Sequence, residues 1–209
     1  MRGRDPPKRY AVSHPPDAAS RIESVARWAL VVVLALLTWR FARLPIDGSG
    51  DIGFLHLPDL VFHEAGHIIL SPFDRFIGVL GGSLMQVLVP VVCAIAFVRH
   101  GNAFGAAVCT WWAGQNLIDL APYIADARRL QLVLLGGFTG QEVEGHDWEY
   151  LLTTLGWLRY DVTLGRASQA AGALVMTGAL LWAAVVASLS HSQDRNPSPV
   201  VGTSQRWRT

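Results

Sequence analysis

Long apolar segments bounded by charged residues are the feature that most constrains how this 209-residue chain can fold. Hydrophobic residues make up 51% of the sequence and charged residues only 16%, whereas roughly 25% of the residues of a soluble domain are charged. The charges gather at the two ends and in one central loop. The sequence therefore predicts an all-α, polytopic protein that is integral to the cell (inner) membrane.

Five apolar segments are candidates for membrane helices. The first is centred on residues 28–39, and it reaches membrane length if Arg27 and Arg40 extend to the two interfaces. The second, at 58–72, is shorter and contains polar residues, and the others are expected at 81–98, 103–126 and 167–189. The distribution of lysine and arginine then favours a cytoplasmic N-terminus and an external C-terminus. We expect about five transmembrane helices.

The regions outside these helices are polar. Residues 1–22 are rich in proline and arginine, and we expect them to be disordered on the cytoplasmic side. Residues 23–190 are the predicted helical membrane domain, and residues 191–209 are a predicted flexible tail. Cys93 and Cys109 both lie in apolar helices, where free cysteine is commonly buried, so no disulfide framework is expected.

The second predicted helix contains the sequence His63-Glu64-Ala65-Gly66-His67. Residues four apart project from nearly the same face of a helix, so His63 and His67 can bind one tetrahedral zinc ion. Glu64 lies beside them, where it can take a proton from a water molecule that the metal activates. Ionisable groups in an apolar segment are costly unless they are paired or bind a metal, which favours a metal site over a pair of core histidines.

A catalytic zinc site usually has three protein ligands and an open position for water, so a further ligand is needed. The fourth predicted helix offers Asp119 and Asp126, which lie with Asn116 and Tyr123 along one stripe of the helix. Two acids on one face of a membrane helix need a partner, and a metal held by the second helix would be one. Either acid is a candidate third ligand, and the other would orient a histidine.

Two further residues are candidates for roles at the site. His146 lies in a polar loop before the amphipathic stretch 148–157, and it becomes a candidate third ligand if this loop folds over the site. The next residue, Asp147, is suited to capping the N-terminus of a helix. Gln86 is a candidate hydrogen-bond donor to a substrate carbonyl or a ligand carboxylate, and a bond between helices is the alternative.

With these motifs, the chain resembles the intramembrane zinc metallopeptidases of the site-2 protease family. The resemblance rests on the motif at residues 63–67, on a glycine-rich start to the next helix, and on a later helix that carries Asn116, Pro122 and Asp126. It implies that Asp126 is the third zinc ligand and that Asn116 lies near the substrate. Asp119 and His146 remain candidates for the third ligand on the residues alone.

The sequence therefore predicts a membrane-embedded metallopeptidase with Zn²⁺ as its cofactor and Glu64 as its general base. Its partners would be the lipid bilayer and a protein or peptide substrate. The alternative is a non-catalytic, metal-binding membrane protein related to such peptidases. The net charge of +1 gives no reason to expect a nucleic-acid partner, and the sequence does not indicate an oligomeric state.

Overall fold

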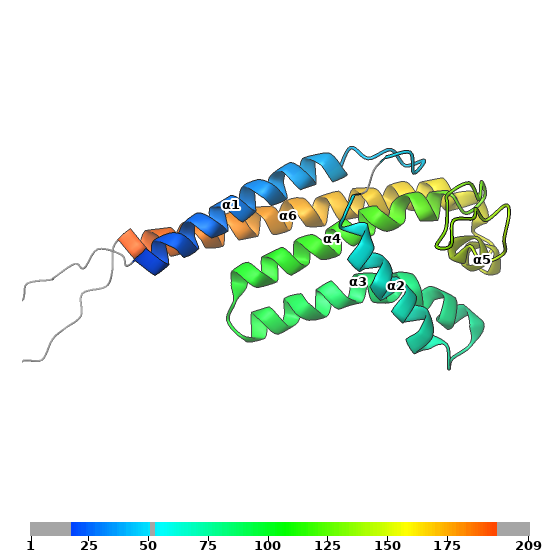
Figure 1. Cartoon of the computed structure of the whole chain (residues 1–209), viewed down its shortest axis with the longest axis horizontal. Helices are drawn as coiled ribbons and strands as arrows, with labels where there is room; N and C mark the ends of the chain where they lie inside the picture. Colours follow the sequence, from blue (N-terminus) through cyan, green and yellow to red (C-terminus); the bar gives the residue numbers. More distant parts are fainter. Residues whose placement is uncertain (1–17, 51–52, 196–209) are drawn as a thin grey trace, which may run out of the picture.

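The computed structural model describes residues 18–50 and 53–195, and most of these residues are helical (Figure 1). Within these ranges, β-type pairing is limited to an isolated bridge between Val133 and Thr139. In chain order the helices are α1 (Ala18–Phe41), α2 (His56–Leu70), α3 (Arg75–Arg99), α4 (Ala103–Ala125), α5 (Asp147–Thr154), the short 3₁₀ helix η1 (Leu158–Tyr160) and α6 (Asp161–Arg195).

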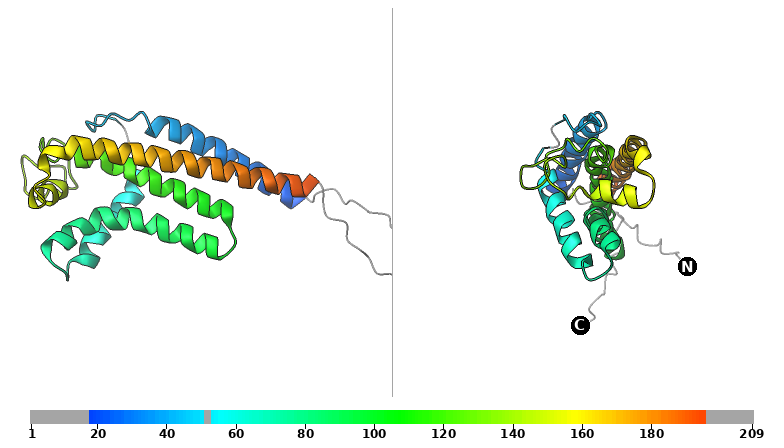
Figure 2. Two further views of the ribbon diagram at one scale, coloured as in Figure 1. Left: turned by 180° about the vertical axis from the view of Figure 1, so that it is seen from behind. Right: turned by 90° about the vertical axis from the view of Figure 1, so that its right-hand side faces the viewer.

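Helix α4 is the central helix of the molecule. It packs along α6 on one side and against α3 on another, and α1 lies along α6 (Figures 1 and 2). The contact between α4 and α6 is close because Gly114 and Gly172 face each other: a Cβ atom on Gly172 would lie 2.5 Å from the carbonyl oxygen of Gly114. Ile118 and Met176 are buried beside this contact. Small residues thus let two long helices approach each other.

Helices α2 and α3 form a second closely packed pair. Gly66 and Gly81 face each other, and a Cβ atom on Gly81 would lie 2.5 Å from the carbonyl oxygen of Gly66. Helix α3 begins after Asp74, whose side chain accepts a hydrogen bond from the backbone N–H of Ile77 at 2.9 Å. This close approach brings the histidine motif of α2 against the first turns of α3.

The segment between α4 and α5, residues 126–146, is irregular and is organised by its own polar groups. The carboxylate of Asp126 accepts a hydrogen bond from the backbone N–H of Leu132 at 2.9 Å. His146 caps α5, because its Nδ1 atom accepts a hydrogen bond from the N–H of Glu149 at 3.2 Å. Trp148 then donates from Nε1 to Ser83 Oγ at 3.1 Å, which fixes α5 against α3.

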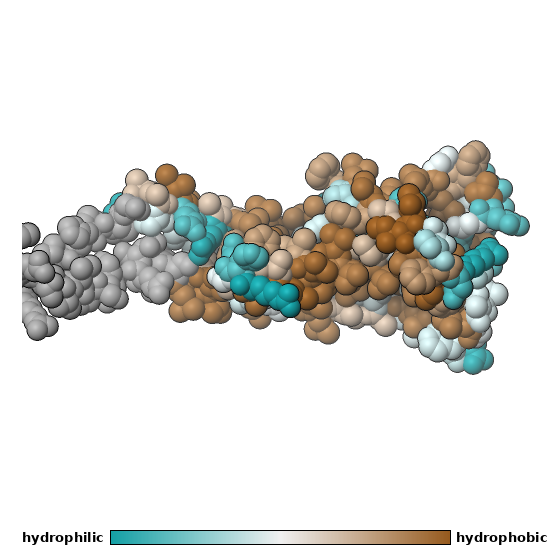
Figure 3. Space-filling model, turned by 90° about the horizontal axis from the view of Figure 1, so that it is seen from below, coloured by the Kyte–Doolittle hydropathy of each residue, from teal (hydrophilic) through white to brown (hydrophobic). Residues whose placement is uncertain are grey.

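Three segments are long and apolar enough to cross a membrane. They are α1, α3 and residues 158–189, which comprise η1 and most of α6. Apolar side chains cover the middle of the face shown in Figure 3, and hydrophilic side chains gather at the end that carries α5. A hydrocarbon layer is about 30 Å thick, so this distribution fits a protein whose long helices lie in lipid.

The predicted all-α fold with membrane-type helices is confirmed, whereas five crossings stay a prediction. Helix α2 has only 15 residues, and polar residues such as Gln115 and Asp119 lower the hydropathy of α4. Helix α1 begins at Ala18 and α6 ends at Arg195, so helix extends beyond both bounds of the predicted domain 23–190. Residues 1–17 and 196–209, which hold most of the predicted disordered segment and tail, lie outside the described residues. Cys93 and Cys109 are free thiols, and both are partly rather than fully buried.

Candidate metal centre

His63 and His67 present their Nε2 atoms on the same side of α2. Each ring is fixed through its other nitrogen: His63 Nδ1 lies 2.9 Å from Gln86 Oε1, and His67 Nδ1 lies 3.0 Å from the carbonyl oxygen of Gly78. The orientation of the Gln86 amide is itself determined, because its Nε2 donates to the carboxylate of Asp119 at 2.8 Å. Both acceptors are oxygen atoms, so Nδ1 carries the proton and Nε2 is left as the metal-binding atom in each ring.

Asp147, the first residue of α5, completes a group of three possible ligands. Its Oδ2 atom lies 3.0 Å from His63 Nε2 and 3.2 Å from His67 Nε2. All three ligand atoms lie within 4.8 Å of one another. Zinc bonds of about 2.0–2.2 Å in a tetrahedral arrangement place ligand atoms about 3.3–3.6 Å apart. The two Asp147 distances are slightly shorter than this range, and two imidazoles with one carboxylate form a ligand set that catalytic zinc ions use.

Gly82 on α3 lets the two histidine rings lie close to the backbone of this helix. A Cβ atom at this position would lie 2.5 Å from His63 Nε2 and 2.5 Å from His67 Nε2. Any larger residue at this position would therefore displace the two nitrogens that are available to bind a metal.

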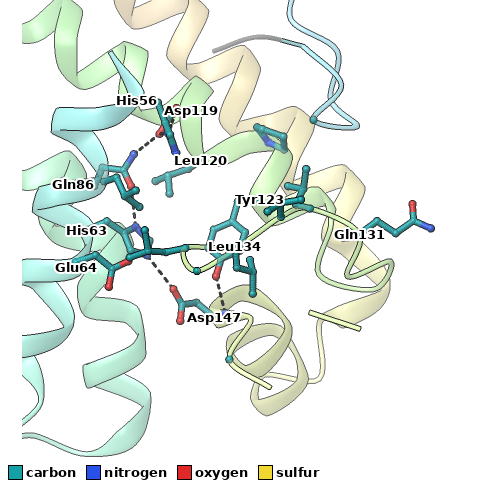
Figure 4. Close-up of a pocket in the computed structure, with 18 of the residues that line it drawn as sticks. His56, His63, Glu64, Gln86, Asp119, Leu120, Tyr123, Gln131, Leu134 and Asp147 are labelled. Atoms are coloured by element: carbon teal, nitrogen blue, oxygen red, sulfur yellow. Dashed lines mark hydrogen bonds and ion pairs between the residues drawn. The ribbon is translucent and has the colours of Figure 1, made fainter. Parts of the chain in front are cut away.

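The three candidate ligands and Glu64 line one cavity of about 1090 Å³ (Figure 4). The carboxylate of Glu64 has no hydrogen-bonding partner among the residues that the structure describes, so it is available to a water molecule or a substrate. The other walls come from further residues of α2, from α3, from α4, from residues 47–49 and from the segment before α5. They include apolar side chains, namely Leu60, Leu120, Leu132, Val133, Leu134, Leu135 and Val143.

Electrostatics within the group favour binding of a positive charge. Burial raises the pKa of the Asp147 carboxyl, but hydrogen bonds with His63 and His67 outweigh burial and leave this pKa below its ordinary value. The hydrogen bond with Asp147 is also the main cause that raises the pKa of His67 to about 9. A proton and a metal ion would therefore compete for the same position.

A chain of hydrogen bonds continues from His63 away from the candidate ligands. Gln86 connects His63 to Asp119, and the Asp119 carboxylate lies 3.0 and 3.1 Å from His56 Nδ1 (Figure 4). The hydrogen bond with Asp119 raises the pKa of His56. Asp119 is thus held by Gln86 and His56, and it supports His63 through Gln86.

The structure places Asp147, rather than Asp119, Asp126 or His146, beside the two Nε2 atoms. Asp126 is fully buried at the end of α4, where it accepts the N–H of Leu132 and lies 3.6 Å from His146 Nε2. His146 uses Nδ1 to cap α5, and burial is the main cause that lowers its pKa. These contacts give Asp126 and His146 structural roles in the segment before α5.

The two predicted substrate-binding residues lie in different environments. Asn116 is fully buried within the helices, where its side chain donates to the carbonyl oxygen of Trp112 at 2.9 Å, and it does not line the cavity. Gln86 lines the cavity, but both ends of its amide are already bonded, to His63 and to Asp119. Gln86 therefore orients a candidate ligand.

Sequence reasoning considered Asp147 only as a helix cap. In the structure the cap is His146, one residue earlier, and this shift leaves the Asp147 carboxylate free to face the histidines. The sequence signal was present in His146-Asp147, which offers two possible caps where a helix needs one. Which of them caps α5 depends on contacts with α2 and α4 that lie far away in the sequence.

Searches with this chain against protein-family models, curated proteins and solved structures found no match. The resemblance to the site-2 protease family therefore stays a prediction. His63, His67, Asp147 and Glu64 are the residues whose geometry indicates a function.

Proposed function

We propose that this chain is a membrane-embedded zinc metallopeptidase. The observation that carries the proposal is the meeting of His63 Nε2, His67 Nε2 and the Asp147 carboxylate in the cavity that Glu64 also lines. These residues come from two helices that are far apart in the sequence, and the two ring nitrogens that face Asp147 are the ones left available for a metal. The proposal assigns His63, His67 and Asp147 as zinc ligands.

A bound zinc ion would supply Lewis acidity, which polarises a peptide carbonyl and lowers the pKa of a water molecule. The chain supplies the proton transfer. Glu64 takes a proton from water as the water oxygen adds to the carbonyl carbon, and it later gives this proton to the leaving amine nitrogen. Gln86 and the carbonyl of Gly78 keep the histidine rings in the orientation that binding needs.

The number of ligands supports a catalytic site over a structural one. Among the residues that the structure describes, the group contains three histidine or acidic side chains and no fourth. Structural zinc sites are usually closed by four protein ligands, whereas catalytic sites keep one position open. The alternative, a non-catalytic metal-binding protein, would need a fourth protein ligand to close the site.

The position of the site along α3 supports a substrate at membrane depth. Arg75 and Arg99 bound this helix over about 36 Å, and Gly82 lies about 10 Å from the Arg75 end at 1.5 Å per residue. If the two arginines lie at the interfaces, the histidines are inside the bilayer boundary. The apolar wall formed by Leu120, Leu132 and Leu134 suits the side chains of an apolar peptide segment.

The test compares the full-length protein with His63→Ala and Glu64→Gln variants in detergent. Zinc is measured by elemental analysis, and hydrolysis of a mixture of apolar peptides is measured by mass spectrometry. We expect about one zinc ion per chain in the unchanged protein and in Glu64→Gln, no zinc in His63→Ala, and hydrolysis by the unchanged protein alone. A folded protein that was never exposed to chelator and holds no zinc would overturn the proposal.

A further inference from the structure

Tyr123 has a hydroxyl group in the cavity that the proposed function does not use. It lies in the last turn of α4, and its oxygen accepts a hydrogen bond from the backbone N–H of Asp147 at 3.0 Å (Figure 4). A phenol oxygen that accepts one hydrogen bond still has its own proton to donate. The ordinary pKa of tyrosine is about 10, so the hydroxyl is protonated at neutral pH.

The position of this hydroxyl is fixed relative to the candidate ligands. It is bonded to the backbone of Asp147, whose carboxylate lies 3.0 Å from His63 Nε2. The Tyr123 ring lies 6.1 Å from the His63 ring and 4.4 Å from the His146 ring, centre to centre. Tyr123 and Glu64 line the same cavity, and in the view of Figure 4 they lie on either side of His63. A substrate carbonyl near the metal position would therefore be within reach of the hydroxyl.

We propose that Tyr123 is a catalytic residue that donates a hydrogen bond to the oxygen of the scissile carbonyl as this oxygen becomes negatively charged. The inference rests on the proposed function. When the water oxygen bonds to the carbonyl carbon, the π electrons of the carbonyl move onto its oxygen and Glu64 takes the proton. The carbon–nitrogen bond then breaks, the carbonyl re-forms, and the proton passes from Glu64 to the amine. Tyr123 keeps its proton throughout, and its hydrogen bond is strongest when the charge is greatest.

The alternative role for the Tyr123 hydroxyl is to position the Asp147 carboxylate. The Asp147 carboxylate acts on Tyr123 both electrostatically and through a hydrogen bond with its hydroxyl, and a hydroxyl that kept its proton directed at this carboxylate would hold it in place for the metal. The two roles differ in what is lost when the hydroxyl is removed. Loss of a positioning group weakens metal binding, whereas loss of an oxyanion donor weakens binding of an anion at the metal and leaves metal binding intact.

The experiment uses the full-length protein in detergent, loaded with Co²⁺, and a Tyr123→Phe variant. Competition with a chelator gives the affinity for Co²⁺, and the visible spectrum of the bound Co²⁺ gives the dissociation constant of acetohydroxamate. This compound carries an anionic oxygen comparable to that of the reacting carbonyl. We expect Co²⁺ affinity within about threefold of the unchanged protein and acetohydroxamate binding weaker by about tenfold or more, as for loss of a donor to an oxyanion.

The matched control is Tyr150→Phe, which removes a hydroxyl from α5. The Tyr150 ring faces Arg75 at 4.4 Å and does not line the cavity, so both measurements should stay unchanged. If Tyr123→Phe does not fold, 3-fluorotyrosine at position 123 tests the same idea in the opposite direction. Its hydroxyl is more acidic and donates more strongly, so acetohydroxamate should bind more tightly.

Three other outcomes would overturn the inference, and one of them would also overturn the proposed function. Unchanged acetohydroxamate binding in Tyr123→Phe removes the oxyanion role and leaves the zinc site intact. A tenfold or greater loss of Co²⁺ affinity assigns the hydroxyl to positioning of Asp147, and also overturns the inference. If the unchanged protein binds no Co²⁺, the proposed function fails and the inference fails with it.

Discussion

Glycines lie at two critical contacts of this molecule, and they serve different purposes there. Between α4 and α6, Gly114 and Gly172 face each other, and an added Cβ atom would meet the backbone of the opposite helix. Between α2 and α3, an added Cβ atom on Gly82 would instead meet the Nε2 atoms at the ends of two histidine side chains. The first contact lets two helices pack together, and the second lets two candidate ligands lie against the backbone of α3.

This difference separates the requirements for folding from the requirements for metal binding. Backbone atoms in a helix cannot move away from a new methyl group without moving the helix, whereas an imidazole can rotate away. The α4–α6 region should therefore respond to substitutions through stability, and the α2–α3–α5 end should respond through its affinity for a metal.

The largest expected effect is that of Gly82→Ala. The new methyl group would displace both histidine rings, so we expect zinc binding to be lost while the helical content is retained. Zinc content by elemental analysis and helical content by circular dichroism measure the two properties. Gly178→Ala on α6 is the control, because a Cβ atom there has no neighbour within 4 Å. Full zinc content in Gly82→Ala would show that the metal does not bind between these rings.

For Gly172→Ala, at the α4–α6 contact, we expect a loss of stability while zinc binding is retained. An overpacked helix contact typically costs about 1–3 kcal/mol of stability, so the melting temperature should fall. Zinc affinity of the folded protein should stay within a few-fold of the original. If Gly172→Ala lost zinc at unchanged stability, the proposed separation of the two regions would be wrong.

The second prediction compares Asp147, which lies beside the two histidines, with Asp126, which the sequence offered as a candidate ligand. Asp147→Asn should weaken zinc binding by about 100-fold or more, a larger effect than typical changes behind a ligand. Asp126→Ala should leave zinc affinity nearly unchanged, and it should cost about 1–3 kcal/mol of stability because the N–H of Leu132 loses its buried acceptor. Competition with a chelator and thermal unfolding measure these effects. If Asp126→Ala lost zinc affinity and Asp147→Asn kept it, Asp126 would be the ligand, as the family resemblance implies.

These two acids also illustrate what the sequence could predict. The apolar segments predicted the helices, although α3 begins at Arg75 and not at residue 81, because the Asp74 cap starts it earlier. His63, Glu64 and His67 could be grouped because they lie within two turns of one helix, so local geometry alone brings them together. The sequence therefore predicted the part of the candidate site that one helix brings together.

The remaining site residues depend on contacts between distant segments. Asp147 faces α2 only because α5 packs against α3 through Trp148 and because His146 takes the capping position. Gln86 was predicted as a polar group near the site, and its actual partners, His63 and Asp119, depend on how α2 and α4 flank α3. Neither the position of Asp147 nor the partners of Gln86 can be predicted from the spacing of neighbouring residues in the sequence.

The third prediction concerns the hydrogen bonds behind His63. Gln86→Met keeps the size of the side chain but removes the acceptor for His63 Nδ1, so zinc binding should weaken by about 10–100-fold. The control is Gln115→Met in α4, where a buried amide does not line the cavity. The measurement is the affinity for zinc by competition with a chelator. Equal effects of the two substitutions would mean that Gln86 acts through packing alone.

The smallest expected effect is that of Trp148→Phe. This change tests whether the attachment of α5 affects zinc affinity or only the stability of the protein. The change removes the hydrogen bond from Trp148 to Ser83, worth about 1 kcal/mol, and keeps an aromatic ring against α3. Because Asp147 precedes Trp148, looser attachment of α5 should also lower zinc affinity, by a few-fold. Trp157→Phe is the control, since Trp157 is exposed beyond the end of α5. A loss of stability with zinc affinity unchanged would indicate that the metal itself is enough to hold Asp147. The contact between α5 and α3 would then be purely structural, like the α4–α6 contact.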